Sequence, residues 1–348
     1  MLTETQSRIK VRIVRALHTR LLEWYRQNRR VLPWRGTADP YAVLVSEIML
    51  QQTRATAVIP YYDRWMRVFP TLESLANATL SKVLRAWAGL GYYARARHLR
   101  RAAQIIVRRY NGKIPRNLAE LQTLPGIGRY TAGAVASIAF SQAAPVLDGN
   151  VIRVLSRLFL IEQDTSTTQI RKLLWSLAEE ILPKSHPGDF NQALMELGAT
   201  VCLADTPKCS LCPLRKVCQA RRYDQASRLP VVRKRKPTRH MMEYAIILMQ
   251  NNRVWLNRRK QGELMAGLWV FPRLQSVRQI EAQFPGLLTK HIGRVEHTVM
   301  NRRITVEAIV VDGCKGTLNE GRWVSRRNLL SMPLPAADRR LATLSTST

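Results

Sequence analysis

The sequence of 348 residues predicts a multidomain protein, in which an all-α N-terminal domain is followed by a smaller α/β domain. Two patterns predict this fold class. Apolar residues first recur every three or four positions, the period of an amphipathic helix. After Cys218 they form short β-branched or aromatic runs bounded by Gly, Asn and Asp, which is typical of strands. We therefore expect domains at residues 1–222 and 241–348, joined by a linker at 223–240.

The first domain is predicted to be a series of helices. In the segment IKVRIVRALHTRLLEWYRQN one helical face carries the apolar residues Ile9, Ile13, Leu17, Leu21 and Trp24. Two further helical stretches cover residues 40–69 and 75–110, and the second includes an arginine-rich helix at Tyr92–Tyr110. Turn-forming pairs interrupt the pattern at residues 32–33, 39–40, 69–70, 111–112 and 182–183.

The second domain is predicted to contain strands. The runs EYAIILMQ, RVWLNRR, GLWVFP and RITVEAIVVDG are the strand candidates. The linker before them holds few apolar residues and the basic run at 233–236, which is either a solvated tether or an additional phosphate contact.

The charge balance indicates a polyanionic partner. Lys and Arg number 55 against 24 Asp and Glu, a formal net charge of +31. Such an excess is most simply explained by nucleic acid binding. The sequence has no apolar run long enough to span a bilayer, and charges interrupt its N-terminus, which does not resemble a signal peptide. We expect a cytoplasmic, nucleoid-associated protein with no membrane contact.

Two glycines mark a tight turn in the stretch LPGIGRYTAG. Gly126 and Gly128 lie between the apolar stretch LAELQTL and a second helix, and they permit positive φ and a close approach of the backbone to a ligand. The amides and the dipole at the start of that helix favour an anion, such as a DNA phosphate. An ordinary helix–turn–helix packing corner has the same pattern.

Four of the five cysteines have the spacing of a metal site. Cys202, Cys209, Cys212 and Cys218 form C-x6-C-x2-C-x5-C, and Cys314 is separate. Clustered thiols in a reducing compartment indicate metal ligands rather than disulfides. Both zinc and a 4Fe–4S cluster use four cysteines.

Two carboxylates stand in positions of interest. Glu47 lies among apolar residues in VLVSEIMLQQT, where it is either paired structurally or available for chemistry. Asp148 precedes an amphipathic stretch in LDGNVIRVLSRL, so it is either a helix N-cap or a functional acid.

The hairpin and the cysteine spacing resemble the endonuclease III superfamily of DNA glycosylases. LPGIGRYTAGAV, residues 124–135, is similar to the turn of its helix-hairpin-helix, which would cover about residues 118–140, and Asp148 follows at the matching distance. The resemblance implies that Gly126, Gly128 and Arg129 grip the DNA backbone. It also implies a 4Fe–4S cluster in the loop 202–218, held by Cys202, Cys209, Cys212 and Cys218.

The position of Tyr130 separates two reaction types in that superfamily. Bifunctional members carry a lysine there, which forms a Schiff base with the sugar. Tyrosine cannot form this imine, which implies base removal without a lysine-driven strand cut.

The stretch SEIMLQQT narrows the resemblance to the adenine DNA glycosylase (MutY) family. LPWRG, GLGYYARARHL and FNQALMELG also match, so that the similarity covers about residues 20–220. The resemblance implies a DNA N-glycosylase of base excision repair, which is expected to act as a monomer on double-stranded DNA. It would remove adenine mispaired with 8-oxoguanine or guanine.

The chemistry assigns a role to each carboxylate. Adenine leaves easily only after a ring nitrogen is protonated, and an apolar pocket keeps an acid protonated near neutral pH. The resemblance makes Glu47 the general acid at adenine N7. An ionised Asp148 would stabilise the cation that develops on the sugar, or trap it covalently. Asn150 and Tyr130 would assist through hydrogen bonds.

Further residues match positions that contact DNA bases in the family. Gln52 and Tyr92 match positions that wedge into the base stack beside 8-oxoguanine. The flipped adenine would lie among Trp34, Arg35, Leu50 and Gln51. Extruding a base costs a few kcal/mol and costs least at a mispair. For Trp34 and Tyr92, plain core packing is the alternative.

The C-terminal region resembles the Nudix-like lesion-recognition domain of the family through AGLWVFP. It has no REXXEE-type run, so hydrolysis of nucleoside diphosphate derivatives is not expected. Alignment on His297-Thr298 puts Asn301 where many members have the histidine of an F-x-H motif that reads 8-oxoguanine. Asparagine hydrogen-bonds differently and carries no charge.

Three other functions are compatible with parts of the sequence. A mismatch thymine or pyrimidine-lesion glycosylase shares the hairpin, but Glu47 and GLWVFP argue against it. A non-catalytic iron–sulfur redox sensor would bind DNA, yet it gives Glu47 and Asp148 no purpose. A zinc-binding module accounts for the cysteines alone.

Overall fold

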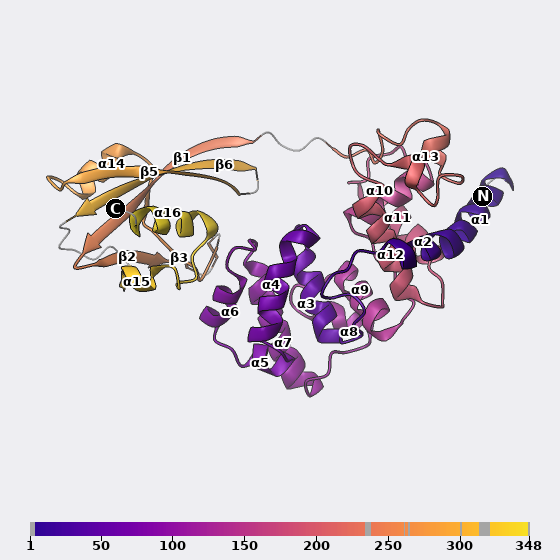
Figure 1. Ribbon diagram of the computed structural model, residues 1–348, viewed down its shortest axis with the longest axis horizontal. Coiled ribbons are helices and arrows are strands. Elements are labelled where there is room, and N and C mark those ends of the chain that lie inside the picture. Colours follow the sequence, from indigo (N-terminus) through magenta and orange to yellow (C-terminus); the bar gives the residue numbers. More distant parts are fainter. Residues whose placement is uncertain are drawn as a thin grey trace. The chain divides into compact units, whose positions relative to one another are not determined.

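The computed structural model describes residues 4–233, 238–260, 262–263, 265–299, 301–312 and 321–346. The chain forms two compact units (Figure 1). The first contains Met1–Met66, Thr71–Glu73 and Arg101–Lys234, and the second contains Arg67–Pro70, Ser74–Arg100 and Arg235–Thr348. The predicted boundaries at 222 and 241 stay a prediction.

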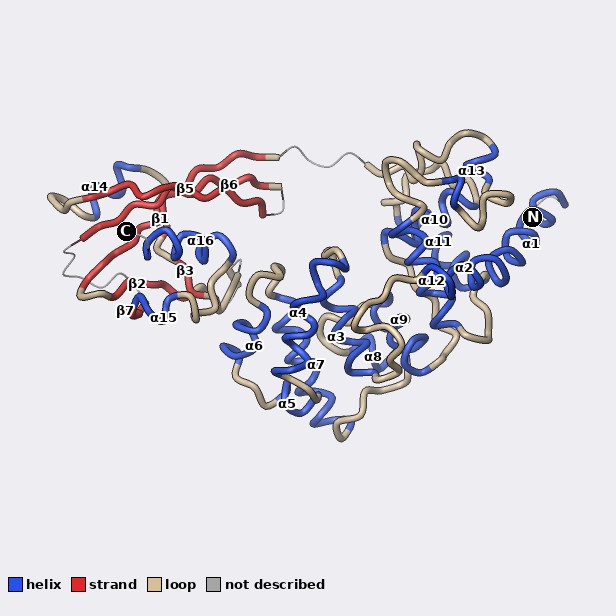
Figure 2. The backbone as a smooth tube through the Cα atoms, in the orientation of Figure 1, coloured by secondary structure: helices blue, strands red, loops and turns tan. Residues whose placement is uncertain are grey.

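The described part of the first unit is helical, as predicted (Figure 2). The expected first helix is present as α1 (Glu4–Ala16), a π-helical turn (Leu17–Leu21) and α2 (Leu22–Asn28), with Ile13, Leu17 and Leu21 fully buried. The unit also contains α3 (Pro40–Leu50), most of α4 (Ala55–Val68), the start of α5 (Leu72–Ala76), the end of α7 (Ala94–Tyr110), α8 (Leu118–Thr123), α9 (Arg129–Phe140), α10 (Gly149–Leu158), α11 (Thr168–Glu180), α12 (Pro187–Thr200), a 3-10 helix (Cys209–Leu211) and α13 (Gln219–Arg222).

Helix α3 is buried on all sides. Pro40 occupies its first turn, and the Asp39 carboxylate accepts hydrogen bonds from the amides of Tyr41 and Ala42, which fixes where the helix begins. All residues from Tyr41 to Met49 are buried, because the helix packs against α9 and other helices of the core. A carboxylate on this helix, Glu47, is therefore buried wherever it points.

The predicted helical stretch 75–110 is broken rather than continuous. It contains the end of α5 (Leu72–Ala76), α6 (Leu80–Trp87) and α7, and the expected helix at Tyr92–Tyr110 begins only at Ala94. Tyr92 has a φ of 48°, a left-handed conformation that no helix accommodates.

Three arginines near the start of α7 are used inside the fold. Arg95 is buried and stacks over the ring of Trp87 at 5.3 Å. The guanidinium groups of Arg97 and Arg100 donate hydrogen bonds to the carbonyls of Ala266 and Ala78, respectively. Part of the arginine excess of this helix thus stabilises the second unit and is not a free basic surface.

The second unit contains the predicted α/β domain. Its mixed sheet, whose strands are red in Figure 2, has the strand order β3-β2-β1-β6-β5, with β4 paired to β1 and β7 paired to β2. The strands are β1 (Arg239–Gln250), β2 (Arg253–Arg258), β3 (Trp269–Val270), β4 (Arg273–Leu274), β5 (Thr289–Val299), β6 (Arg302–Asp312) and β7 (Gly321–Ser325).

Helices cover both faces of this sheet. Ala245, Ile247 and Val306 pack with α16 (Ala336–Thr346), while Ile246 and Leu248 pack with α14 (Val277–Gln283). A short helix, α15 (Arg326–Leu329), follows β7. Strands β1 and β6 run parallel, from Arg239 opposite Arg302 to Met249 opposite Asp312.

Two further findings concern the whole chain. Within the described ranges, no helix has the length and apolar character needed to cross a membrane. The lone Cys314 and residues 234–236 of the basic run, about which the sequence raised questions, lie outside the described residues.

Candidate active site

A cavity of about 890 Å³ lies in the first unit, between α3 and the beginnings of α9 and α10. It brings together nine residues that the sequence singled out, namely Trp34, Arg35, Glu47, Leu50, Gln51, Gln52, Tyr130, Asp148 and Asn150. Leu32, Met195 and Glu196 also line it. Residues far apart in the chain, such as Arg35 and Asp148, thus line the same cavity.

Glu47 is a buried acid at the cavity wall. Its side chain is on α3, the residue is 4% exposed, and Oε2 accepts a 2.7 Å hydrogen bond from the Tyr130 hydroxyl. Burial raises the pKa of Glu47 from 4.5 to about 7, although the bond from Tyr130 and the charge of Arg35 oppose this shift. A substantial fraction of Glu47 is therefore protonated at neutral pH.

Tyr130 comes from the first turn of α9, directly after the glycine turn. Burial and the neighbouring Glu47 raise the pKa of this phenol well above its usual value, so it stays a neutral donor. Its oxygen also lies 3.2 Å from the sulfur of Met195 on α12. The contacts from α3 and α12 fix the position of the ring.

Asp148 caps α10 and faces the same cavity. Its Oδ1 accepts a 2.8 Å hydrogen bond from the Val151 amide, and its Oδ2 accepts a 2.9 Å bond from Nδ2 of Asn150. Burial raises the pKa of Asp148, while these hydrogen bonds favour the ionised form. The N-cap that the sequence suggested is therefore present, and it holds the acid in place.

Arg153 fixes the orientation of Asn150. Its Nη2 donates to Oδ1 of Asn150 at 2.8 Å and to the carbonyl of Gly198 at 2.7 Å, and its Nε donates to the carbonyl of Cys202 at 2.7 Å. Because Oδ1 of Asn150 accepts from a group that can only donate, its amide nitrogen must turn toward Asp148.

Glu196 is a residue that sequence reasoning missed. It is 1% exposed and accepts hydrogen bonds from the side chains of Arg30 and Arg35. Burial alone would raise the pKa of Glu196, but the bonds from these arginines lower it to about 2. The sequence did offer one indication of a functional residue, an acid within the apolar helix FNQALMELG. Its arginine partners, however, lie more than 160 positions away in the chain.

Two predicted base-stack residues have strained backbones. Gln52 and Tyr92 are exposed and have φ values of 57° and 48°. Left-handed conformations of non-glycine residues cost energy and cluster at functional sites. Gln52 lines the cavity, whereas Tyr92 belongs to the second unit and is not among its lining residues.

The glycine turn has the predicted form in part. Gly126 uses the freedom that glycine permits, with a φ of 79°, whereas Gly128 has a φ of −87°, which other residues also adopt, and extends the chain into α9. A Cβ at Gly128 would meet nothing within 4 Å, which leaves its backbone open to an incoming group. Arg129 follows and stacks over Trp175 at 4.0 Å.

Asn301 lies in the turn between β5 and β6 of the second unit. Its carbonyl accepts a 2.8 Å hydrogen bond from the Arg239 amide, which ties the turn to the start of β1. Val299 ends β5, and Met300 lies outside the described residues.

The four predicted metal ligands surround one small cavity. Cys202, Cys209, Cys212 and Cys218 are free thiols that line a cavity of about 30 Å³ together with Arg157. Burial raises the pKa of Cys212 to about 12 and also raises the pKa of Cys218. Buried thiols of this kind ionise when a cationic centre binds them, so the donor set suits a metal or cluster. The four thiols share the cavity without being arranged as the ligands of a bound ion: over the described ranges, no three Cys, His, Asp or Glu side chains lie close enough together to hold one.

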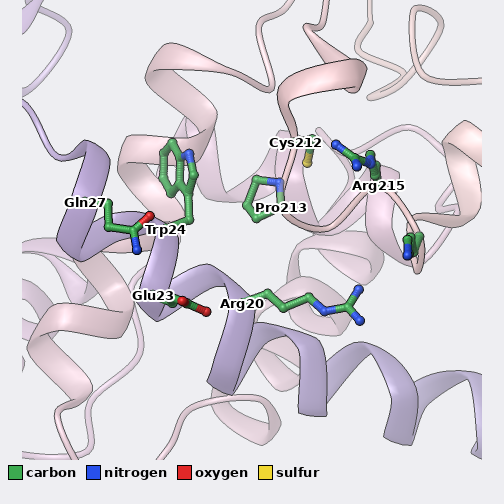
Figure 3. Close-up of a pocket in the computed structure, with 8 residues that line it drawn as sticks. Arg20, Glu23, Trp24, Gln27, Cys212, Pro213 and Arg215 are labelled. Atoms are coloured by element: carbon green, nitrogen blue, oxygen red, sulfur yellow. The ribbon is translucent and has the colours of Figure 1, made fainter.

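A second hollow lies beside this loop (Figure 3). It measures about 300 Å³ and separates Trp24 and Gln27 of α2 from Cys212, Pro213 and Arg215. The face of the loop that carries Cys212 is thus lined by both polar and aromatic groups.

Comparisons with known proteins agree with this geometry. Residues 45–180 match the HhH-GPD superfamily of base excision DNA repair proteins, and residues 243–344 match the NUDIX domain. A thermostable thymine-DNA glycosylase superposes with a TM-score of 0.56 at 32% identity, covering 63% of this chain and 99% of that one. An endonuclease III in complex with DNA shares the fold, with a TM-score of 0.53 at 24% identity, covering 64% and 99%.

The fold and site define a helix-hairpin-helix DNA N-glycosylase of base excision repair that is followed by a Nudix-like domain. The adenine DNA glycosylases of Homo sapiens and Rattus norvegicus are 38% and 36% identical to this chain, over 84% and 90% of its length. The match spans 66% of the human protein and 74% of the rat protein. The chain therefore belongs to the adenine DNA glycosylase family.

Proposed function

We propose that this protein removes adenine mispaired with 8-oxoguanine or guanine from double-stranded DNA, and that it acts as a monomeric, monofunctional glycosylase. The observation that carries the proposal is the buried Glu47, hydrogen-bonded to Tyr130 and facing the same cavity as Asp148. A proton donor and an anion in one cavity are the two groups that hydrolysis of a purine N-glycosidic bond needs.

Glu47 acts as the general acid. With a pKa near 7, it is protonated often enough at neutral pH to donate to N7 of an extruded adenine. Protonation turns the base into a better leaving group. Tyr130 holds one carboxyl oxygen, so the other is left to carry the proton toward the base.

Asp148 stabilises the sugar cation that forms as the bond breaks. Its two oxygens are held by Val151 and Asn150, so its negative charge is pre-oriented before the reaction. Arg35 and Glu196 form the polar wall of the same cavity, where they are placed to recognise the edge of a base.

The side chain at position 130 supports a monofunctional reaction. A strand cut through a Schiff base requires an amine, and this position holds a phenol that is bonded to Glu47. Water then completes the reaction at the sugar carbon, either by attack on the cation or after Asp148 has trapped it covalently.

Contacts with the DNA backbone are supported by the hairpin. Gly126 and Gly128 leave the backbone bare, and α9 begins without a side-chain cap or an acidic residue in its first turn. A phosphate would satisfy these amides and the nearby charge of Arg129. We further propose that the Nudix-like domain reads the base opposite adenine, and that Asn301 contributes to this recognition.

We propose a 4Fe–4S cluster as the cofactor, held by Cys202, Cys209, Cys212 and Cys218. The cavity that the four thiols share supports it. When bound, the cluster would cross-link the loop 202–218 and hold its backbone against α10.

The test is a single-turnover assay on duplexes with adenine opposite 8-oxoguanine, guanine or thymine. Wild type should release adenine opposite 8-oxoguanine, and Glu47→Gln should reduce the rate at least about a hundredfold, because it keeps the shape but not the acid. Glu179→Gln, which changes an exposed carboxylate on α11, is the control and should leave the rate unchanged.

Two further readouts separate the alternatives. Borohydride should trap no covalent protein–DNA adduct, and strand cleavage should require added alkali. Release of thymine rather than adenine, or DNA binding with no base release, would overturn the proposal. Equal rates opposite 8-oxoguanine and guanine would overturn the part assigned to Asn301.

A further inference from the structure

A fully buried arginine lies against the four cysteines. Arg157 on α10 is 1% exposed and lines the same cavity as the four thiols. A guanidinium group stays charged at any physiological pH. A buried charge destabilises a fold unless an opposite charge compensates it.

The hydrogen bonds of Arg157 point toward the loop that carries Cys202. Its Nη1 donates to the Leu203 carbonyl at 2.6 Å and to the sulfur of Cys202 at 3.2 Å. Its Nε and Nη2 donate to the carbonyls of Leu229 and Ala204, at 2.8 Å and 2.9 Å. Three of the four acceptors are neutral carbonyls, and the sulfur is the one that becomes an anion when it ligates a metal.

We propose that Arg157 is the internal counter-ion of the metal centre. Four ligated thiolates leave such a centre with a net negative charge, and Arg157 places its positive charge on one of them from inside the protein. The inference rests on the proposed 4Fe–4S cluster. It makes Arg157 a positioning residue for Cys202, and it makes the fold around residues 202–229 depend on the cluster.

Other basic residues near the cavity provide a contrast. Arg221 lines it as well, but its side chain is exposed and donates to the carbonyl of Arg215. Water screens such a charge, so its removal should matter little. Arg221→Met is therefore a control that changes the same kind of residue at the same cavity.

The experiment compares the cluster-containing wild type with Arg157→Met, Arg157→Lys and Arg221→Met. We expect absorbance near 400 nm to decay at least about tenfold faster in Arg157→Met on exposure to air and a chelator. Arg157→Lys keeps the charge and should fall between wild type and Arg157→Met, and Arg221→Met should match wild type. The reduction potential should be lower in Arg157→Met, because loss of a positive charge favours the more oxidised cluster.

Thermal unfolding with and without the cluster tests the charge itself. Arg157→Met should unfold at a lower temperature than wild type when both hold the cluster. After removal of the cluster the order should reverse, since the wild type then buries an uncompensated cation. A role limited to tying three carbonyls together would destabilise both forms equally, and that result would overturn the inference.

The outcomes distinguish this inference from the proposed cofactor. Wild type that purifies without iron would overturn the cluster, and the counter-ion with it. If wild type binds iron, but Arg157→Met loses the same thermal stability with and without the cluster, the counter-ion role would be overturned and the cluster would stand. If Arg157→Met does not fold, Arg157→Lys tests the counter-ion role instead. A cluster that stays bound in Arg157→Lys would support this role, whereas a cluster lost at tenfold the wild-type rate would overturn it.

Discussion

The hydroxyl of Tyr130 lies 2.7 Å from Oε2 of Glu47 and joins the first turn of α9 to the middle of α3. The helix that begins at the glycine turn and the acid proposed to protonate adenine are therefore connected by one hydrogen bond. The bond favours the ionised carboxylate, while burial favours the protonated one, and burial prevails.

Removing this bond should shift the pH dependence of base release. In Tyr130→Phe, Glu47 loses a donor that stabilises its anion, so its pKa rises further above about 7. The rate should then decline at a higher pH than in wild type, which single-turnover rates between pH 6 and 9 would measure. Tyr223→Phe, at an exposed tyrosine, should leave the profile in place; an unmoved profile in Tyr130→Phe would contradict the assignment of the acid.

The same acid makes folding stability depend on pH. The folded pKa of Glu47, about 7, is raised above its ordinary value of 4.5, so the folded state binds the proton more tightly than the unfolded state. The contribution of this carboxyl to folding stability is fully present below pH 4.5 and is lost as the pH rises to about 7 and beyond. At pH 8 the free energy of unfolding of Glu47→Gln should therefore exceed that of wild type, by up to about 3 kcal/mol.

Urea unfolding at pH 5 and pH 8 would measure this difference. The advantage of Glu47→Gln should shrink toward pH 5, where the wild-type carboxyl is mostly protonated. Glu179→Gln, exposed on α11, should show no such pH dependence. An advantage that is equal at both pH values would indicate a cause other than titration.

Gly198 permits the close approach of α12 to Asn150. A Cβ at this position would lie 2.5 Å from Cβ of Asn150, so one of the two helices must move. Gly198→Ala should cost about 1–3 kcal/mol of stability. It should also slow base release, because Asn150 would no longer orient Asp148.

Gly149→Ala is the matched control for stability, since its Cβ would meet nothing within 4 Å. Denaturant unfolding of both variants would give the comparison. If Gly198→Ala is as stable as Gly149→Ala, α12 and α10 can move apart at little energetic cost, which would contradict the prediction.

Arg129 should contribute to DNA affinity through its charge. Its guanidinium is exposed beside the glycine turn and stacks on Trp175. Arg129→Ala should weaken binding similarly for all duplex sequences and reduce the slope of log affinity against log salt by about 1. Fluorescence anisotropy at several salt concentrations would measure the slope, and an unchanged slope would exclude a phosphate contact.

The sequence predicted the parts of the site that local patterns encode. Asp148 followed as an N-cap from the amphipathic stretch after it, and the apolar neighbours of Glu47 marked this acid as unusual. They did not decide between a paired or half-exposed carboxylate and the buried one that is found. Contacts between distant segments left no such pattern. Glu196 could not be matched with Arg30 and Arg35, because no periodicity connects helix α12 to the loop before α3.

The fold was predictable to a similar depth. The helical first unit and the mixed sheet followed from apolar periodicity, but β5 was missed because the run TKHIGRVEHTV is mostly polar. Arg95 was expected on a basic helix face, yet it is buried against Trp87. Stacking of a guanidinium on an aromatic ring depends on tertiary contacts that composition does not report.

The place of Asp148 at the beginning of α10 has an electrostatic consequence. The start of a helix carries a partial positive charge, and α10 directs this end at the cavity. An unshielded helix end would repel a sugar that is becoming a cation. With a carboxylate as the cap, the local field changes sign, and the helix end attracts the cation instead. Asp148→Asn would preserve the cap and restore the repulsion, so that helix stability and the field at the sugar would be separated in a single variant.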